Sequence, residues 1–479
     1  MLPTDTGADT RADVAVVGTG VIGLATAWEA ARRGLRVHLV GPCSGAHQGQ
    51  ASRAAGAMLA PFSEVAASDS PERVALEVGE RVAARNLYDA WLPSLREATG
   101  RPLALTPGMW VVATTGGRGD ARELDAIADA ALGHGHVAER HDPGEVPGLS
   151  PARSCTAHGA LWLPGEATVD SGELMAALTD ALHAHAHVEW TDAEATGLRP
   201  SDGGGLTVTC AGAPGTPEVA APRVVLAVGV GLTDLVAGSG ELDLALPPML
   251  AGKGVSALLR DVPVELPAAV RTPMRDFACG MHLVPRADGT VYLGATNRLS
   301  PSAAVRFPLV MELADLLREA GEELSTKLYE GQLVGTRVGY RPFTLDHLPL
   351  VGPTADPRVL IASGTYRNGM LLAPRLAEMI ADHLTLDPVA AHPFDPTRPI
   401  TPHALPETLE RWLPELVDLF LPPSGTPTPM QGVLADLLHQ SLRGLAADGD
   451  HPRGAEVRRT WQQAPVPEAL WSLLVTYLR

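Results

Sequence analysis

The chain has 479 residues, 45% of them hydrophobic, and carries a formal net charge of −18. A chain of this length and apolar content exceeds one compact core and is typical of two packed domains with an appendage. Its acidic surface would repel phosphates, which argues against nucleic acid as a partner.

The N-terminal segment, residues 1–13, is polar and has no basic stretch ahead of an apolar one. The sequence also lacks an uninterrupted run of about 18 apolar residues, so we expect neither a signal peptide nor a membrane span. The cysteines lie far apart and form no C-x-x-C pair; they are Cys43, Cys155, Cys210 and Cys279. Free thiols suit a reducing compartment, and we expect a cytoplasmic protein.

Residues 12–41 are expected to form a strand, a glycine-rich turn, a helix and a second strand. The turn has the pattern G-x-G-x-x-G, made by Gly18, Gly20, Val21, Ile22 and Gly23 with Thr19. The first glycine makes a tight turn, the second lets the backbone approach a pyrophosphate, and the third lets helix and strand pack closely. The phosphates would meet unpaired N–H groups at the helix start, which predicts a dinucleotide site.

The second strand lacks one feature that such sites commonly have. An acidic residue usually ends this strand and binds the adenosine ribose, and that position falls at about Gly41. We therefore expect the ribose contact to come from backbone or from the loop at 44–50, where Ser44 is a candidate. The glycines alone do not distinguish NAD from FAD.

The middle of the chain alternates strand-like and helix-like segments. Short apolar runs predict strands at 104–113, 158–163, 187–190, 206–210, 223–228, 255–259, 282–284, 290–293, 332–340 and 358–362. Helical patterns occur at 72–98, 171–183, 308–320 and 369–383.

The tail, residues 400–479, opens on a proline-rich hinge and continues with helical segments near 406–421, 429–447 and 465–478. Apolar residues recur along it at helical spacing, as Leu409, Leu416 and Phe420 do. Apolar helix faces of this kind either pack on the parent domain or associate with another chain. A homo-oligomer formed through the tail is therefore one of two interpretations.

Three longer stretches carry a family resemblance. Residues 51–61 read ASRAAGAMLAP, residues 339–353 read GYRPFTLDHLPLVGP, and residues 364–374 read GTYRNGMLLAP. Together they resemble the glycine oxidase family within the D-amino-acid oxidase flavoproteins. The similarity extends over about residues 12–385, and the tail has no counterpart that we recognise.

The resemblance implies an α/β fold. A Rossmann-like FAD-binding domain of the glutathione-reductase type would be interleaved with an antiparallel-sheet substrate domain. We assign 12–80, 150–235 and 335–390 to the FAD-binding domain, 81–149 and 236–334 to the substrate-binding domain, and 400–479 to a small all-α extension.

The resemblance also implies the site residues. Arg341 would bind a substrate carboxylate through two parallel hydrogen bonds, and Arg367 would either place a cation near substrate or flavin or hold its loop through a salt bridge. Met58 joins this catalytic group. Besides the glycine turn and Ser44, the residues expected to bind FAD non-covalently are Ser52, Arg53, Ala54, Ala55, Gly56, Val188, Ala227, Gly229, Arg367, Asn368, Gly369 and Met370.

Two positions depart from the family's pattern. His282 stands where the family has a tyrosine, and Asn297 stands where it has a methionine. If both side chains line the pocket, the preferred substrate is a polar or N-substituted relative of glycine. The other interpretation is that both side chains bond only neighbouring backbone.

The implied reaction is oxidation of a small amino acid or amine at the carbon beside its nitrogen. Hydride would pass to the flavin, an imine would form, and O2 would be the electron acceptor, giving hydrogen peroxide. The other readings are a flavin dehydrogenase that uses an electron carrier, a tailoring oxidase acting on a larger polar amine, and a cofactor-bearing scaffold that binds partners. We expect no metal, because His183, His185 and His187 have no carboxylate or cysteine close by to complete a ligand set.

Overall fold

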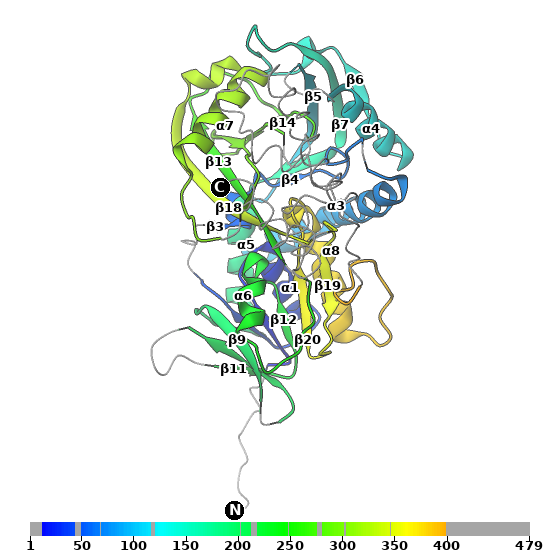
Figure 1. Ribbon diagram of the computed structural model, residues 1–479, viewed down its shortest axis with the longest axis vertical. Coiled ribbons are helices and arrows are strands. Elements are labelled where there is room, and N and C mark those ends of the chain that lie inside the picture. Colours follow the sequence, from blue (N-terminus) through cyan, green and yellow to red (C-terminus); the bar gives the residue numbers. More distant parts are fainter. Residues whose placement is uncertain are drawn as a thin grey trace, which may run out of the picture.

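The computed structural model describes residues 12–43, 49–67, 69–115, 120–201, 203–211, 218–247, 249–274, 280–300, 303–344 and 346–398. Ser44, Cys279, the first 11 residues and the predicted helices of the tail lie outside these ranges. The described chain is a mixed α/β protein, as expected, built around two large sheets (Figure 1). No helix in the described ranges combines the length and apolar character needed to cross a bilayer.

The first sheet has six strands in the order β19-β20-β12-β1-β2-β8. Neighbouring strands are parallel except β19, which runs antiparallel to β20. The strands are β1 (Val14–Val17), β2 (Val37–Val40), β8 (Val188–Thr191), β12 (Val224–Leu226), β19 (Leu350–Pro353) and β20 (Val359–Ser363). Because β1 is buried on both faces, it reads as a continuous apolar run, and the strand predicted there is confirmed.

Helices cover one face of this sheet and a small sheet covers the other. Val14 and Val16 pack against α1 (Val21–Arg32), α5 (Ser171–Ala184) and α8 (Gly369–Thr385), with α3 (Pro71–Thr99) beyond. Ala15 and Val17 face the opposite way, into a core made with the three-stranded sheet and α6. These elements are β9 (Ala195–Pro200), β10 (Leu206–Cys210), β11 (Val219–Ala221) and α6 (Leu232–Ala237).

The second sheet has eleven strands and forms the other half of the molecule, the upper half in Figure 1. Its main path is β3 (Gly49–Gln50), β18 (Gln332–Phe343), β13 (Leu250–Arg260), β16 (Val291–Gly294), β15 (His282–Pro285), β14 (Ala269–Arg271), β5 (Leu105–Thr114), β7 (Ala157–Val169) and β4 (Met58–Leu59). Two further strands, β17 (Arg298–Ser300) and β6 (Glu139–His141), pair with β13 and β7. Most pairs are antiparallel, and α4 (Asp120–Gly133) and α7 (Val310–Glu323) pack against this half.

The two sheets do not follow the domain ranges expected from the sequence at every point. Those ranges placed residues 157–169 and 335–343 with the dinucleotide half, but β7 and β18 both pair within the large sheet. The helix α3, which crosses the expected boundary at 80, packs on α5 and α8 of the first half. The sheet that a strand joins depends on which other strands pair with it, and the strand's own sequence does not identify those strands.

One short stretch, residues 49–59, lies between the two halves. It contains β3, the short helix α2 (Ala51–Ala54) and β4. β3 pairs in parallel with β18, and β4 pairs antiparallel with β7. The stretch therefore belongs to the large sheet at both ends, while its middle faces the glycine turn of the other half.

A buried ion pair fastens α7 to the large sheet. Lys253, on β13, donates to both carboxylate oxygens of Glu312 at 2.9 and 2.7 Å, and their side chains are 7% and 3% exposed. Glu312 also accepts from the backbone N–H of Leu309 at 2.8 Å. Burying two charges in this way is stable only while each has its partner.

Replacing Glu312 by glutamine should therefore lower the free energy of unfolding by about 3 kcal/mol, because it leaves the Lys253 ammonium buried without its counter-charge. Denaturant unfolding measures the effect. The control is Glu322→Gln on the same helix, whose side chain is 42% exposed, and it should change stability by less than about 0.5 kcal/mol. Equal stabilities for the two variants would show that the pair does not hold the helix.

Candidate active site

A cavity of about 800 Å³ lies where the two halves meet. Most residues singled out from the sequence line it: Gly18, Gly20, Val21, Ile22, Ser52, Ala54, Ala55, Gly56, Met58, Ala227, Gly229, His282, Arg341, Arg367, Asn368, Gly369 and Met370. Four of those described do not line it: Gly23, Arg53, Val188 and Asn297. The cavity brings together segments separated by more than three hundred residues of chain.

The glycine turn between β1 and α1 is closely packed. At Gly18, where φ is +116°, a Cβ would lie 2.4 Å from the carbonyl oxygen of Ala227. At Gly23 a Cβ would lie 1.9 Å from the carbonyl oxygen of Gly18. The third glycine therefore lets the helix pack closely on the strand, and it does not line the cavity. A Cβ on Gly20 would meet only the Ser52 hydroxyl, at 3.4 Å, so the backbone there is open to the cavity. These are the roles that a dinucleotide turn needs.

The start of α1 offers an anion site. Its N-cap, Gly20, has no side chain to cap the helix, and the first turn has no acidic residue. The Val21 N–H donates to the Ser52 hydroxyl oxygen at 3.0 Å, so an N–H group at the start of this helix already binds an oxygen atom. Free N–H groups and the helix dipole favour a phosphate there.

Large-sheet side chains hold the segment 51–58 through its backbone carbonyls. The Tyr292 hydroxyl donates to the carbonyl of Ala54 at 2.8 Å, and Arg337 donates to the carbonyl of Arg53 at 2.6 Å. A Cβ on Gly339 would lie 2.7 Å from the Ala54 side chain, so the strand and the segment are in close contact. Met58 continues this wall of the cavity from β4.

Arg341 lies on β18, across from Gly252 of β13. Its guanidinium rests over Gly254, where a Cβ would come within 2.4 Å of a guanidinium nitrogen. The same nitrogen donates to the Thr296 carbonyl at 3.0 Å and to the Asn297 side-chain oxygen at 2.8 Å. The head of Arg341 is thus fixed in orientation while it lines the cavity.

Asn297 is the link in a chain of side chains. Its amide nitrogen donates to the Tyr366 hydroxyl at 2.6 Å, and its oxygen accepts from Arg341. Gly252 makes room for it, because a Cβ there would lie 2.7 Å from the amide oxygen. This placement differs from both interpretations of Asn297, since the amide bonds two other side chains and is not part of the cavity wall.

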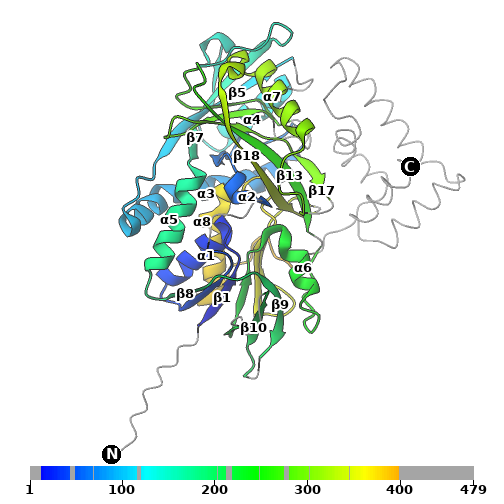
Figure 2. The same ribbon diagram turned by 90° about the vertical axis from the view of Figure 1, so that its left-hand side faces the viewer.

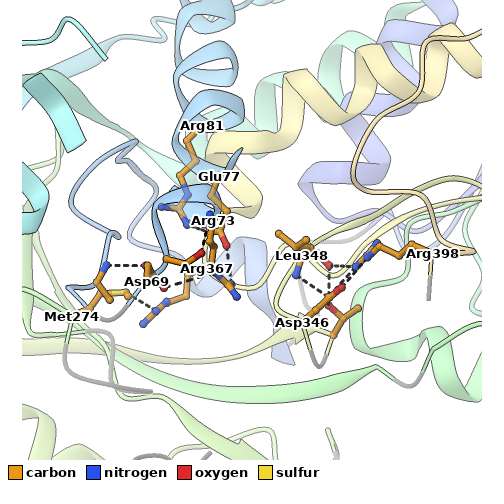
Figure 3. A network of polar contacts seen from close by, with 12 residues as sticks. Asp69, Arg73, Glu77, Arg81, Met274, Asp346, Leu348, Arg367 and Arg398 are labelled. Carbon is orange, nitrogen blue, oxygen red and sulfur yellow. Dashed lines mark hydrogen bonds and ion pairs between the residues drawn. The ribbon is translucent and has the colours of Figure 1, made fainter. Parts of the chain in front are cut away.

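Arg367 lies over the ring of Tyr366, 4.7 Å from its centroid, and forms an ion pair with Glu64. Its Nε lies 3.1 Å from a Glu64 oxygen, and the other Glu64 oxygen accepts from Arg271 at 2.5 Å. Figure 3 shows Arg367 reaching Met274 as well. Burial alone would raise the pKa of Glu64, but Arg271 and Arg367 lower it to about 2, so the carboxylate stays ionised.

The loop that follows Arg341, between β18 and β19, is anchored by Asp346. Arg398 donates to both of its carboxylate oxygens, at 2.8 and 2.9 Å, and to the carbonyl of Leu348 (Figure 3). Thr344 donates to the same carboxylate at 2.7 Å. This pair fixes the stretch between Arg341 and the start of β19.

His282 lines the cavity, is 4% exposed and stacks on Tyr292. Its Nδ1 lies 3.2 Å from the carbonyl of Gly280. Burial, reinforced by the charges of Arg271 and Arg341, lowers the pKa of His282 to about 3. The imidazole is therefore neutral at physiological pH and contributes polarity without charge.

A second helix start faces the cavity. The helix α8 begins at Gly369, has Asn368 as its N-cap without a side-chain hydrogen bond, and has no acidic residue in its first turn. Asn368, Gly369 and Met370 all line the cavity. The Tyr88 hydroxyl donates to the carbonyl of Met370 and holds the helix start to α3. Two helix N-termini thus direct positive potential into one cavity.

Sequence reasoning missed four residues that shape this site: Glu64, Arg271, Tyr292 and Tyr366. Tyr366 stands inside one of the three motifs, and Glu64 follows another by three residues, so their positions were a signal. Nothing in the sequence around Arg271 or Tyr292 identifies them, because their partners lie about 200 residues away.

The three alternating histidines take part in ring packing. His183 stacks on Trp190, while His185 contacts Trp28 and His187 edge to face. Within the described ranges, no group of three or more histidine, cysteine, aspartate or glutamate residues is arranged to hold a metal ion.

Comparison with known proteins places these features in a family context. The family described as FAD dependent oxidoreductase matches residues 13–383, which contain every residue lining the cavity. The glycine oxidase of Geobacillus kaustophilus (strain HTA426) is 31% identical over 375 residues, covering 78% of this chain and 92% of that protein. The glycine oxidase of Pseudomonas aeruginosa is 30% identical over 376 residues, covering 77% and 93%. The crystal structure of the Geobacillus kaustophilus glycine oxidase is similar with a TM-score of 0.69 and 30% identity, covering 82% of this chain and 100% of that one.

The lowered pKa of His282 predicts a pH-dependent loss of stability. Because the pKa is about 3 in the folded protein and about 6.5 in an unfolded chain, the unfolded state binds the proton first as pH falls. The fold then loses stability from about pH 6.5 towards pH 3, by about 2 kcal/mol at pH 5. His282→Gln should remove this share from the difference between denaturant unfolding at pH 7 and pH 5. His158→Gln, at an exposed position of β7, should leave the difference as in the parent; a parent-like difference in His282→Gln would refute a buried neutral imidazole.

Proposed function

The chain belongs to the family of FAD-dependent oxidoreductases, and from that premise we propose that it oxidises a small amino acid or an N-substituted glycine. The carbon beside the amine loses a hydride, an imine forms and then hydrolyses, and dioxygen is reduced to hydrogen peroxide. One observation carries the proposal. A guanidinium fixed on Gly254 by Thr296 and Asn297 lines the same cavity as the glycine turn at the start of α1.

The described residues fit FAD. The open backbone at Gly20, the uncapped start of α1 and the Ser52 hydroxyl suit the pyrophosphate. The wall made by residues 54–58 and the start of α8 would hold the isoalloxazine, without a covalent bond. When bound, FAD supplies the two-electron chemistry, accepting the hydride and passing electrons to dioxygen.

Arg341 would bind the substrate carboxylate. A guanidinium presents a fork of N–H donors that matches a carboxylate, and two parallel bonds set the direction of the Cα–H bond. Asn297 and the Thr296 carbonyl hold one nitrogen of the fork, so the head does not have to be ordered when substrate arrives. Its half-buried position strengthens the pair relative to one in water.

No described side chain needs to act as a base in this proposal. The Glu64 carboxylate is neutralised by Arg271 and Arg367, and His282 is neutral but buried against Tyr292. A substrate that binds with a neutral amine uses its own lone pair to expel the hydride. The chain would contribute orientation and the two helix dipoles.

His282 supports a substrate more polar than glycine. The imidazole Nε2 would lie 2.6 Å from a Cβ on Gly294 and 3.4 Å from one on Gly56, so it occupies the wall beside the segment 51–58. A neutral imidazole can donate or accept one hydrogen bond there, and an N-substituent of the substrate would supply the partner. Because two relatives are named glycine oxidase, glycine is the substrate against which the others are compared.

The flavin-loaded protein should release hydrogen peroxide with such a substrate, and its bound flavin should bleach when oxygen is excluded. Glycine, sarcosine, D-alanine, hydrazinoacetate and N-hydroxyglycine are compared by kcat/KM in a coupled peroxide assay. We expect an N-substituted glycine to exceed glycine by about tenfold or more, because one satisfied buried hydrogen bond contributes about 1.5 kcal/mol. Flavin bleaching without peroxide would indicate a dehydrogenase, and a clear preference for glycine would reject the polar substrate.

Arg341→Met should lower kcat/KM by about 10²- to 10³-fold, since it removes two charge-assisted hydrogen bonds to the carboxylate. The loss should appear mainly in KM, and the flavin spectrum should persist. The control is Arg318→Met on α7, whose side chain is 39% exposed, which should keep parent kinetics. Parent-like kcat/KM in Arg341→Met would end the proposal that this guanidinium binds substrate.

A further inference from the structure

The end of β2 cannot carry the acid that usually binds the adenosine ribose. The residue there is Gly41, with φ at +150°, and a Cβ would lie 2.8 Å from the methyl group of Thr19. The Trp190 indole N–H also donates to the Gly41 carbonyl at 2.8 Å and fixes this backbone. A side chain at position 41 would therefore collide with the dinucleotide turn itself.

The neighbouring strand brings another acid to the same edge of the sheet. β8, the edge strand of the first sheet (Figure 2), runs parallel to β2 with Thr191 beside Val40, so both chains leave the sheet on the same side. The Gly41 N–H donates to the Thr191 carbonyl at 3.1 Å, and the chain after Thr191 then turns into β9. Glu194 ends that turn, and its carbonyl accepts from the N–H of Ala211 at 2.7 Å.

Glu194 lines the cavity together with Gly41 and Pro42. Glu194 is exposed, and within the described ranges its carboxylate has no hydrogen-bond or ion-pair partner. The other acid in this turn, Asp192, is engaged, because its carboxylate accepts from the N–H of Cys43 at 2.9 Å. Glu194 is thus the available acid beside the position that Gly41 leaves empty.

We propose that Glu194 binds the adenosine ribose of FAD, accepting hydrogen bonds from its vicinal hydroxyls. A carboxylate has two oxygens that can each accept from one hydroxyl, and charged acceptors form the stronger bonds. The role normally filled from the end of the second strand passes to the turn after the adjacent parallel strand. The inference rests on FAD as the cofactor and is independent of which amine is oxidised.

The test is the affinity of the apoprotein for FAD, followed by flavin fluorescence quenching. Glu194→Gln should weaken FAD binding by about tenfold or more, as expected for loss of a charge-assisted hydrogen bond. Glu189→Gln is the matched control: it removes one charge from β8 itself, at a side chain that is 67% exposed and outside the cavity wall. It should bind FAD like the parent protein.

A second ligand separates a direct contact from a general change in the cavity. The second ligand is an FAD analogue whose adenosine ribose lacks both hydroxyls. The parent should bind this analogue about tenfold less tightly than it binds FAD. Glu194→Gln should bind the analogue and FAD with about equal affinity. Thermal unfolding of each apoprotein checks that the variants fold. Equal FAD affinity in the parent and in Glu194→Gln would overturn the proposal. So would a variant that still discriminates against the analogue as strongly as the parent, whether or not the protein oxidises any amine tested.

Discussion

The contact between the backbone of residues 53–55 and the large sheet is the constraint on which the site depends. Tyr292 and Arg337 donate to carbonyls of this segment, and Ser171 donates to the carbonyl of Ala55 at 3.1 Å. Two of its three residues are alanines, so the hydrogen bonds to its carbonyls do much to position it. Because it faces the glycine turn of one half and is paired to the other, it sets how the glycine turn and Arg341 lie relative to each other. The cavity lies between the two halves, so its geometry depends on these hydrogen bonds to residues 53–55.

The charge states of Glu64 and His282 and the orientation of Arg341 at the cavity follow from their neighbours. Arg271 and Arg367 share Glu64, which stays ionised despite its burial because of those two partners. Arg341 is bonded to neutral acceptors only in the contacts that orient it, an amide and a carbonyl oxygen. His282 is kept neutral by burial and by the surrounding arginines, so it adds no further charge. An anionic ligand in this cavity would meet an oriented guanidinium and two helix N-termini.

The parts of the site that the sequence predicted are those encoded within a few residues. The spacing of Gly18, Gly20 and Gly23 specifies the turn, because each glycine acts on its own strand or helix. The helix that follows this turn and the helix start at 369 are specified in the same way. The Asn297 bridge between Arg341 and Tyr366 could not be predicted, since it joins three segments whose proximity results from strand pairing. The same holds for the pairing of β7 and β18 in the large sheet, since the domain ranges expected from the sequence placed β7 and most of β18 with the dinucleotide half.

By itself, the sequence determined the residue types, the local elements and the family, because short-range patterns and motifs act within one turn or strand. The tertiary structure decided which charges are buried together, which side chains hold Arg341, and that Gly41 is closed while Glu194 lies beside it. These outcomes depend on hydrogen bonds and contacts between residues tens to hundreds of positions apart. Their free energies are set by the packing of the whole chain, which no local pattern contains.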